Sequence, residues 1–262
     1  MKWLVFGAAV IVCLAVLQAV GLWRSARVVD GLVVRLNSPP PNLSVELPEA
    51  VRRYAERAGA DGSVRQVRFT QDTEMELKPG EGWQPFAARQ WVDTSRAGFV
   101  WLAEQRMLGL PIVRVVDSYT KDKGLLVAWL LGSIPVARAE GAEADRAEAM
   151  RYLAELPWAP DAMLRNGDLA WQVLGPTQWQ VSLNGATVDM HLNADGDIAE
   201  ITAKDRPAKE GNVMILRDWR GIFRDYADFG GRRIPMSAEV GYVFDEITKP
   251  YFKGRITSYT ME

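Results

Sequence analysis

The chain has 262 residues, of which 48% are hydrophobic and 24% charged, and its 31 Lys and Arg nearly balance its 33 Asp and Glu, giving a net charge of −2. This composition is typical of a folded globular protein, and the balanced charge argues against nucleic acid as a partner, because phosphate backbones are bound by basic surfaces. One Cys and one His exclude a disulfide framework and the usual Cys/His zinc sites, so neither a metal nor another cofactor is expected.

The first strong signal is an uncharged apolar run over residues 3–23, in which Gln18 is the one strongly polar residue. At about 1.5 Å per residue, a helix of this length crosses the ~30 Å hydrocarbon core of a bilayer. Lys2 and Arg24 bracket the run, and a Trp stands at each end, where indole rings favour the headgroup region. We therefore expect a single-pass membrane anchor over residues 1–24. A cleaved signal peptide is the alternative, although the run is long for one.

The charges that flank this run do not fix the side of the membrane on which the rest of the chain lies. Lys2 and the amino terminus stand on one side, and Arg24, Arg27 and Arg35 stand on the other. This is nearly balanced under the positive-inside rule and leans slightly toward a cytoplasmic domain. The compartment therefore stays open on charge alone.

A folded domain is expected over residues 47–262, after a juxtamembrane segment and Pro-rich linker at residues 25–46. Residues 48–58 carry apolar side chains at helical spacing and are followed by Gly59, which predicts a short helix. From Val64 onward the apolar side chains recur at every second residue, which is typical of strands. Strand-like runs separated by turn residues cover residues 64–77, 83–94, 98–107, 112–119 and 125–135. Connections this short cannot hold crossover helices, so an antiparallel meander is expected.

Residues 143–156 interrupt the strands with a helical pattern that ends at Pro157, and residues 161–165 predict a short second helix. Asn184-Gly185 and Asp195-Gly196 are hairpin turn dipeptides. Strand-like runs around them and beyond cover residues 169–174, 178–183, 187–192, 198–204, 233–244 and 251–259. The predicted fold class is α+β, with a large curved antiparallel sheet on which one or two helices pack, plus the N-terminal transmembrane helix.

Few residues form a recognisable catalytic pattern. His191 lies in an alternating strand without a second His, which is typical of a structural strand histidine. Residues 193–197 look superficially like a calcium loop, but Thr202 stands where the bidentate Glu belongs, so we expect a turn. The carboxylates between Asp218 and Glu239 could serve a hydrolase. A loop whose Asp and Arg side chains pair with one another explains the same pattern more simply.

Most of the ten Trp residues lie in the predicted domain. Large aromatic side chains on the concave face of a curved sheet form either a filled core or an apolar cavity. A filled core is the simpler interpretation, and a ligand-binding cavity is the functional alternative. Trp101, Tyr119 and Trp129 are the expected lining of such a cavity, because they lie in the longest apolar strand run.

Four groups of residues carry a resemblance to a known family: Gly98-Phe99-Val100-Trp101; Val116-Asp117-Ser118-Tyr119; Arg151-Tyr152-Leu153-Ala154-Glu155 with Trp158 and Pro160; and Asp225-Tyr226 with Ile234-Pro235 and Glu239-Val240. They resemble a bacterial family of single-anchor membrane proteins that carry a domain of unknown function. The resemblance covers residues 47–262 and implies no activity or catalytic residues. More loosely, the predicted architecture is similar to the periplasmic lipoprotein-carrier fold, a half-open barrel that holds acyl chains.

We therefore expect an extracytoplasmic domain, anchored in the inner membrane by its N-terminal helix, that binds a lipid or acyl chain in a sheet-lined cavity. A non-catalytic interaction module at the membrane surface is the second hypothesis, and a hydrolase is the third. A binder needs a contiguous apolar cavity on the order of 300 Å³ or more. An interaction module needs an exposed apolar patch, and an enzyme needs convergent acids with raised pKa values.

Overall fold

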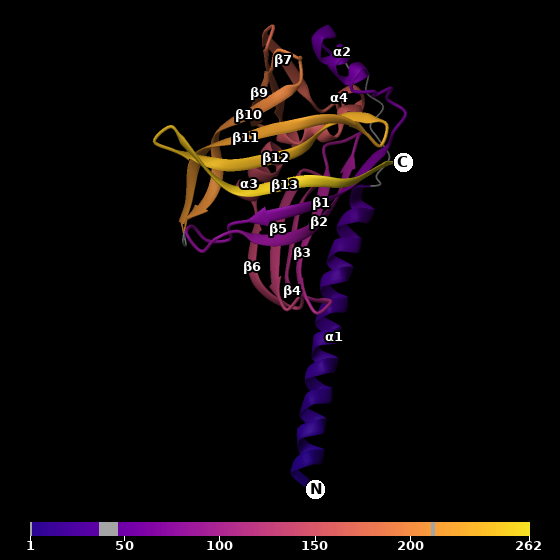
Figure 1. The fold of residues 1–262 in the computed structure, drawn as a ribbon, viewed down its shortest axis with the longest axis vertical. Helices are drawn as coiled ribbons and strands as arrows, with labels where there is room; N and C mark the ends of the chain where they lie inside the picture. The colour runs from indigo at the N-terminus through magenta and orange to yellow at the C-terminus, as the bar shows by residue number, and fades with distance from the viewer. Residues whose placement is uncertain (1, 37–46, 211–212) are drawn as a thin grey trace.

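The computed structural model describes residues 2–36, 47–210 and 213–262 (Figure 1). Within these residues, thirteen strands form one sheet of order β6-β5-β4-β3-β2-β1-β13-β12-β11-β10-β9-β8-β7. The strands form two antiparallel meanders, β1 to β6 and β7 to β13, which join where β1 pairs antiparallel with β13. The antiparallel meander expected from the short connections between residues 64 and 135 is confirmed in β1 to β6, and the last strand of the domain pairs with the first.

The strands follow the predicted order with two differences. The first meander consists of β1 (Gln66–Met75), β2 (Gln84–Asp93), β3 (Phe99–Met107), β4 (Leu110–Thr120), β5 (Lys123–Leu130) and β6 (Ile134–Glu140). The second consists of β7 (Ala170–Gly175), β8 (Gln178–Leu183), β9 (Ala186–Leu192), β10 (Ile198–Glu210), β11 (Val213–Phe229), β12 (Arg232–Phe244) and β13 (Ile247–Met261). The run expected as one strand over 125–135 is a hairpin, and the expected charged loop before residue 233 is the long strand β11.

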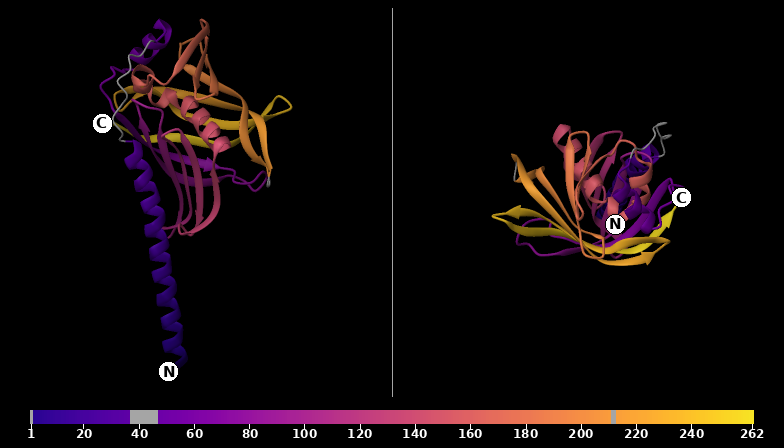
Figure 2. Two further views of the ribbon diagram at one scale, coloured as in Figure 1. Left: turned by 180° about the vertical axis from the view of Figure 1, so that it is seen from behind. Right: turned by 90° about the horizontal axis from the view of Figure 1, so that it is seen from above.

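The chain between the two meanders crosses the concave face of the sheet. It forms α3 (Ala142–Ala154), a 3-10 turn (Leu156–Trp158) and α4 (Pro160–Arg165). Figure 2 shows α3 lying within the curve of the sheet, and the view from above shows the sheet open on one side. The domain is therefore a half-open barrel with a few helices, as expected. The short helix α2 (Glu49–Arg57) buries Val51, Tyr54 and Ala55, which follow the helical spacing seen in the sequence.

Trp158, the last residue of the 3-10 turn, packs in the core against the sheet. Its indole Nε1 donates a 2.8 Å hydrogen bond to the Pro235 carbonyl, and its own carbonyl accepts one of 2.8 Å from the Tyr259 hydroxyl. The Trp158 ring contacts Phe69 and Phe223 at centroid distances of 5.6 and 5.3 Å. A buried indole contributes a large apolar area, and its hydrogen-bonded N–H fixes the orientation of the ring. Because its contacts lie on strands of both meanders, Trp158 connects the two meanders to the turn.

Helix α1 (Lys2–Leu36) is continuous, so residues 25–36 of the expected juxtamembrane segment are helical. These residues cover the convex face of the sheet, where α1 contacts β2, β3 and β4. The buried residues of this second core are Val29, Leu32, Leu36, Val100, Leu102, Val116, Val127 and Trp129. The Pro-rich linker that follows lies outside the described residues. Across the described parts of the chain, no helix has the combination of length and hydropathy required of a membrane span. The anchor stays a prediction.

Candidate ligand-binding cavity

A cavity of about 850 Å³ lies between α3 and the concave face of the sheet. Its lining comes from both meanders and is mostly apolar, with Trp101 and Val115 from the first and Ile201, Trp219 and Phe223 from the second. A volume in the range of 300–1,000 Å³ with apolar walls is typical of small-molecule sites. The structure therefore has the contiguous cavity that the binding hypothesis needs.

Small side chains create this space on one wall. Helix α3 presents Ala144 and Ala147 to the cavity, and the neighbouring strands β5 and β6 present Ala128 and Ala137. Larger side chains at these positions would fill the gap between helix and sheet. The wall opposite is aromatic, so the cavity offers a broad apolar surface to a chain-like ligand.

Charged residues of α3 and its C-cap residue Glu155 form a polar cluster within this apolar lining. Glu148, Arg151 and Glu155 follow one another at spacings of three and four residues, which places them on one helix face toward the cavity. Arg151 Nε lies 2.9 Å from Glu155 Oε1, and Arg151 Nη1 pairs with Asp117 on β4. The Arg151 guanidinium also lies 4.8 Å from the centroid of the Trp101 ring. Carboxylates and an indole thus hold this cation in place.

A second arginine, Arg206 on β10, enters the cluster from the other meander. Its Nη1 donates a 2.7 Å hydrogen bond to the Tyr242 hydroxyl, and its guanidinium lies 4.7 Å from the centroid of the Trp219 ring. Its Nη2 lies 4.0 Å from Glu148 Oε1, which makes a loose ion pair. The cluster therefore holds two guanidinium groups, each against an indole, with carboxyl groups between them.

Burial changes the protonation of this cluster. Burial, followed by the neighbouring charge of Asp117, raises the pKa of Glu148 well above its usual range. Burial alone would lower the pKa of Arg151, but the charges of Glu155 and Asp117 outweigh it and raise this pKa. Glu148 therefore keeps its proton to a higher pH than an exposed glutamate does.

Three atoms of the cluster have no hydrogen-bond partner among the described residues: Glu148 Oε2, Asp117 Oδ1 and Arg206 Nε. Their residues are each less than one tenth exposed and line the cavity. A buried polar atom without a partner is costly, and such atoms in a cavity indicate where a polar ligand group or water binds. The cavity can accept an amphiphile, with its chain along the apolar walls and its polar end at the cluster.

The structure places the three expected lining residues in different environments. Trp101 lines the cavity, and its Nε1 donates a 3.1 Å hydrogen bond to Gln71 Oε1. Trp129 faces the convex side under α1, and Tyr119 is buried in the main core; neither belongs to the cavity lining. Tyr119 accepts a 3.1 Å hydrogen bond from Asn184, and burial raises its pKa to about 12. Trp101 pairs with Asp117 and Asp117 with Leu126, which puts these three side chains on one face of the sheet. Trp129 lies three residues after Leu126, so it faces the opposite side.

The carboxylates proposed for a hydrolase do not converge. Asp218 lies on β11, and its hydrogen bond with Lys204 holds its pKa below the usual range. Glu239 lies on β12 opposite Ile222 and lines a different, outward-facing hollow. A general acid needs the opposite pKa shift, and among the carboxyls of this cavity it is Glu148 that has one.

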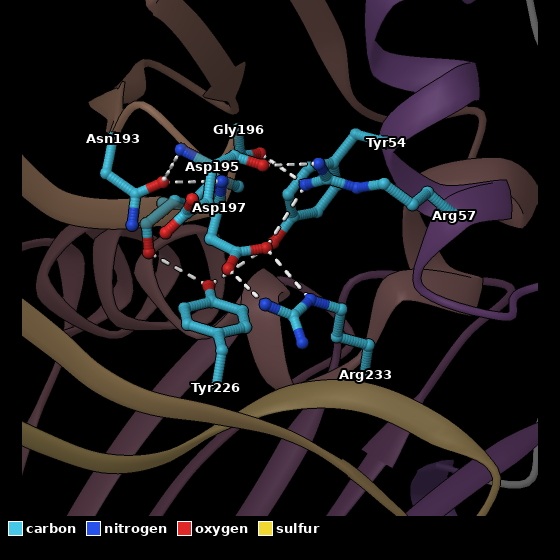
Figure 3. A network of polar contacts seen from close by, with 9 residues as sticks. Tyr54, Arg57, Asn193, Asp195, Gly196, Asp197, Tyr226 and Arg233 are labelled. Carbon is cyan, nitrogen blue, oxygen red and sulfur yellow. Dashed lines mark hydrogen bonds and ion pairs between the residues drawn. The ribbon is translucent and has the colours of Figure 1, made fainter.

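The turn at residues 193–197 has the expected structural role (Figure 3). Asn193 Oδ1 accepts hydrogen bonds from the backbone N–H groups of Asp195 and Asp197, both at 3.0 Å. The Asp197 carboxylate pairs with Arg57 of α2 at 3.1 Å and with Arg233 of β12 at 2.6 Å. The two ion pairs of Asp197 thus connect α2 to strand β12. In the described part of the chain, no group of three or more His, Cys, Asp or Glu is placed to hold a metal.

Residues 39–254 match a family of unknown function, DUF6544. The chain belongs to this family. The resemblance seen in the sequence to a family without an assigned function is thereby confirmed. No curated protein matches this DUF6544 member significantly.

Solved structures show related folds. A DUF1329 family protein from Desulfovibrio piger aligns with a TM-score of 0.50 and 6% identity, over 84% of this chain and 94% of that one. A LolA superfamily protein from Nitrosomonas europaea aligns with a TM-score of 0.45 and 7% identity, over 83% and 94%. A putative outer membrane lipoprotein-sorting protein domain from Vibrio parahaemolyticus aligns with a TM-score of 0.45 and 6% identity, over 81% and 91%. At such identities a likeness concerns the fold alone, so the case for a ligand rests on the cavity itself.

Proposed function

We propose that this DUF6544 protein is a membrane-anchored domain that binds the apolar chain of a lipid or fatty acid between α3 and the sheet. The observation that supports the proposal is the cavity of about 850 Å³ with its alanine and aromatic walls. Burial of an acyl chain in such a space is favourable by about 0.8 kcal/mol per CH₂ group.

The polar end of this ligand lies at the Arg151 and Arg206 cluster. Arg206 Nε is a donor without a partner among the described residues. Because the pKa of Glu148 is raised, protonated Glu148 can donate a hydrogen bond to Asp117, which leaves the Arg206 donor open for an acceptor on the headgroup, such as a carboxylic acid or an ester. A purely hydrocarbon ligand would leave Arg206 Nε unsatisfied.

The anchor in this proposal is residues 3–23 of α1. Where the structure describes the side chains of this segment, Phe6, Val12, Val16 and Leu17 are more than half exposed, so the protein itself does not cover them. Exposed apolar surface of this extent on one helix is typical of contact with lipid. We propose that the domain lies on the extracytoplasmic side of the membrane. Alkaline phosphatase fused after Glu262 tests this orientation, because that reporter is active only outside the cytoplasm.

The binding proposal is tested with a pair of matched variants of the full chain. Ala147→Phe places a phenyl ring in the cavity, whereas Ala142→Phe places it at an exposed position at the start of α3. A fluorescent fatty acid is titrated into both, with near-UV circular dichroism to check folding. We expect Ala147→Phe to lose at least tenfold in affinity and Ala142→Phe to bind like the parent. Equal binding by two folded variants would contradict the proposal.

A further inference from the structure

Two hairpin tips of the first meander lie beside α1, within its apolar run (Figure 1). At the tip between β5 and β6, the Gly132 carbonyl accepts a 2.7 Å hydrogen bond from Ser25 Oγ. At Gly21, a Cβ atom would come within 2.4 Å of Ser133 Cβ, so the hairpin sits directly on the helix. The tip between β3 and β4 packs on the first tip, since Pro111 borders Gly132.

The contact also explains why the apolar run contains one strongly polar residue, Gln18. Gln18 Oε1 accepts a 2.7 Å hydrogen bond from Ser133 Oγ, and Gln18 Nε2 donates to the Leu131 carbonyl. A side-chain amide in a bilayer needs partners, because lipid tails offer none. The β5–β6 hairpin supplies both partners inside the segment predicted to lie in the membrane.

The turns themselves have an unusual composition. Leu108 and Leu131, one at each tip, adopt positive φ angles of 51° and 52°. The other non-glycine residues with positive φ in the described part of the chain are all polar: Lys121, Asp122, Asn184, Asp205, Asp225, Asp245 and Glu246. Asn, Asp and Gly are the usual residues at such turn positions, and a branched apolar side chain is strained there. Strained backbone commonly marks a functional surface.

Both tips expose large apolar side chains. We name this surface the hairpin patch; it comprises Met107, Leu108, Leu110, Leu130, Leu131 and Ile134, each at least 45% exposed and Leu108 96% exposed. Arg24 and Arg27 of α1 are exposed and flank Ser25, which bonds the β5–β6 tip, and Arg106 of β3 is exposed while it pairs with Glu104 at 2.7 Å. Apolar side chains next to a basic rim are typical of surfaces that enter an anionic bilayer.

We propose that the hairpin patch inserts into the headgroup region of the same bilayer that α1 spans. The inference rests on the proposed anchor. Gln18 lies five residues before Trp23, so the β5–β6 tip reaches about 7.5 Å below the level of Trp23 at 1.5 Å per residue. Interfacial protein segments commonly reach ~5–10 Å into the headgroup and acyl boundary. Strand β6 then leads from Ile134 in the patch to Ala137 in the cavity wall, so the membrane contact and the ligand cavity share a strand.

The test uses the full chain in vesicles of phosphatidylcholine and phosphatidylglycerol, with nitroxide labels at a shallow or a deep acyl position. The parent is labelled at its one cysteine, Cys13, with an environment-sensitive fluorophore. In a Cys13→Ala background, Leu108→Cys and Ile134→Cys carry the same fluorophore. Ile247→Cys is the control, because Ile247 is 65% exposed in the β12–β13 hairpin, which points away from α1 (Figures 1 and 2).

We expect deep nitroxides to quench the label at Cys13, shallow nitroxides to quench those at Leu108 and Ile134 at least twofold, and neither to quench that at Ile247. Quenching at Cys13 with none at Leu108 and Ile134 would overturn the hairpin patch and leave the anchor standing. Quenching at Ile247 equal to that at Leu108 would also overturn it, because the contact would not be specific to this face. The absence of quenching at Cys13 would overturn the anchor and the hairpin patch together.

Discussion

Arg206 and Glu148 face each other inside the cavity, with 4.0 Å between Arg206 Nη2 and Glu148 Oε1. The two residues come from β10 and α3, and each retains one polar atom without a partner among the described residues. This loose pair differs from the tight, fully bonded pair between Arg232 and Asp161 in the core. A loose pair with free bonding capacity is better suited to bind a ligand headgroup.

Replacement of Arg206 should therefore affect ligands according to their headgroup. A charge-assisted hydrogen bond contributes about 1.5–3 kcal/mol, or roughly tenfold or more in affinity. We expect Arg206→Gln to weaken binding of a fatty acid about tenfold and binding of the matching fatty alcohol by less than about threefold. Arg217→Gln is the control, since Arg217 lies outside the cavity lining. Competition against a fluorescent probe measures both ligands, and equal loss for acid and alcohol would exclude a headgroup role.

Glu148 should give the folding stability a distinctive dependence on pH. Its pKa is raised in the folded protein, whereas an unfolded Glu titrates near 4.3. Below about pH 4.3 both states hold the proton, and above it the folded state retains a proton that the unfolded chain releases. The contribution of Glu148 to the free energy of unfolding thus falls as pH rises, by at most about 1.4 kcal/mol per unit.

The Glu148→Gln variant removes this titration. Denaturant unfolding of the parent and of this variant between pH 4 and pH 8 measures the effect of Glu148 together with its neighbour Asp117, and carboxyl groups far from both cancel in the difference. We expect the variant to gain stability relative to the parent as pH rises. Parallel curves across this range would show that the pKa of Glu148 is not raised.

The bidentate pair between Arg232 and Asp161 should matter for stability rather than for binding. Its two hydrogen bonds are 2.7 and 2.9 Å long, and Asp161 is fully buried at the start of α4. Arg232→Met leaves this carboxylate without its partner, which should cost about 3–5 kcal/mol in the free energy of unfolding. Urea unfolding measures the change, and a loss below 1 kcal/mol would show that the pair contributes little. Arg138→Met, which breaks an exposed pair on β6, should have no measurable effect.

Trp101 and Trp129 allow a paired test of the two faces of the sheet. Trp101→Phe removes apolar area and the bond to Gln71 in the cavity, so it should weaken fatty-acid binding about threefold or more. Trp129→Phe changes the contact under α1 and should leave binding unchanged. Thermal unfolding checks that both variants fold. A larger loss of affinity for Trp129→Phe would place the ligand on the convex face.

Local sequence patterns predicted most of the strands and helices, because their apolar side chains repeat with the period of the element. Strand β11 was missed although Trp219, Gly221 and Phe223 alternate inward, because a Gly and several charged residues mask the period. The β5–β6 turn was missed because Leu131 occupies a turn position that Asn or Asp usually fills. That same departure marks the hairpin patch.

The polar cluster of the cavity could not be predicted from the sequence, because its residues come from distant parts of the chain. Asp117, Glu148 and Arg206 come from β4, α3 and β10, and only the pairing of β1 with β13 brings the two meanders around α3. No local pattern indicates such a contact. Trp101, Tyr119 and Trp129 were expected together because they lie in the longest apolar strand run, but such a run does not say which face of the sheet each side chain occupies.

We propose above that the cavity between α3 and the sheet holds an apolar chain. Native mass spectrometry of the full chain, purified without denaturant and followed by lipid extraction, tests it most directly, with Ala147→Phe and Ala142→Phe measured in parallel. We expect one bound amphiphile per chain in the parent and in Ala142→Phe, and none in folded Ala147→Phe. A parent protein that is well folded and remains unliganded after incubation with fatty acids and phospholipids would contradict it.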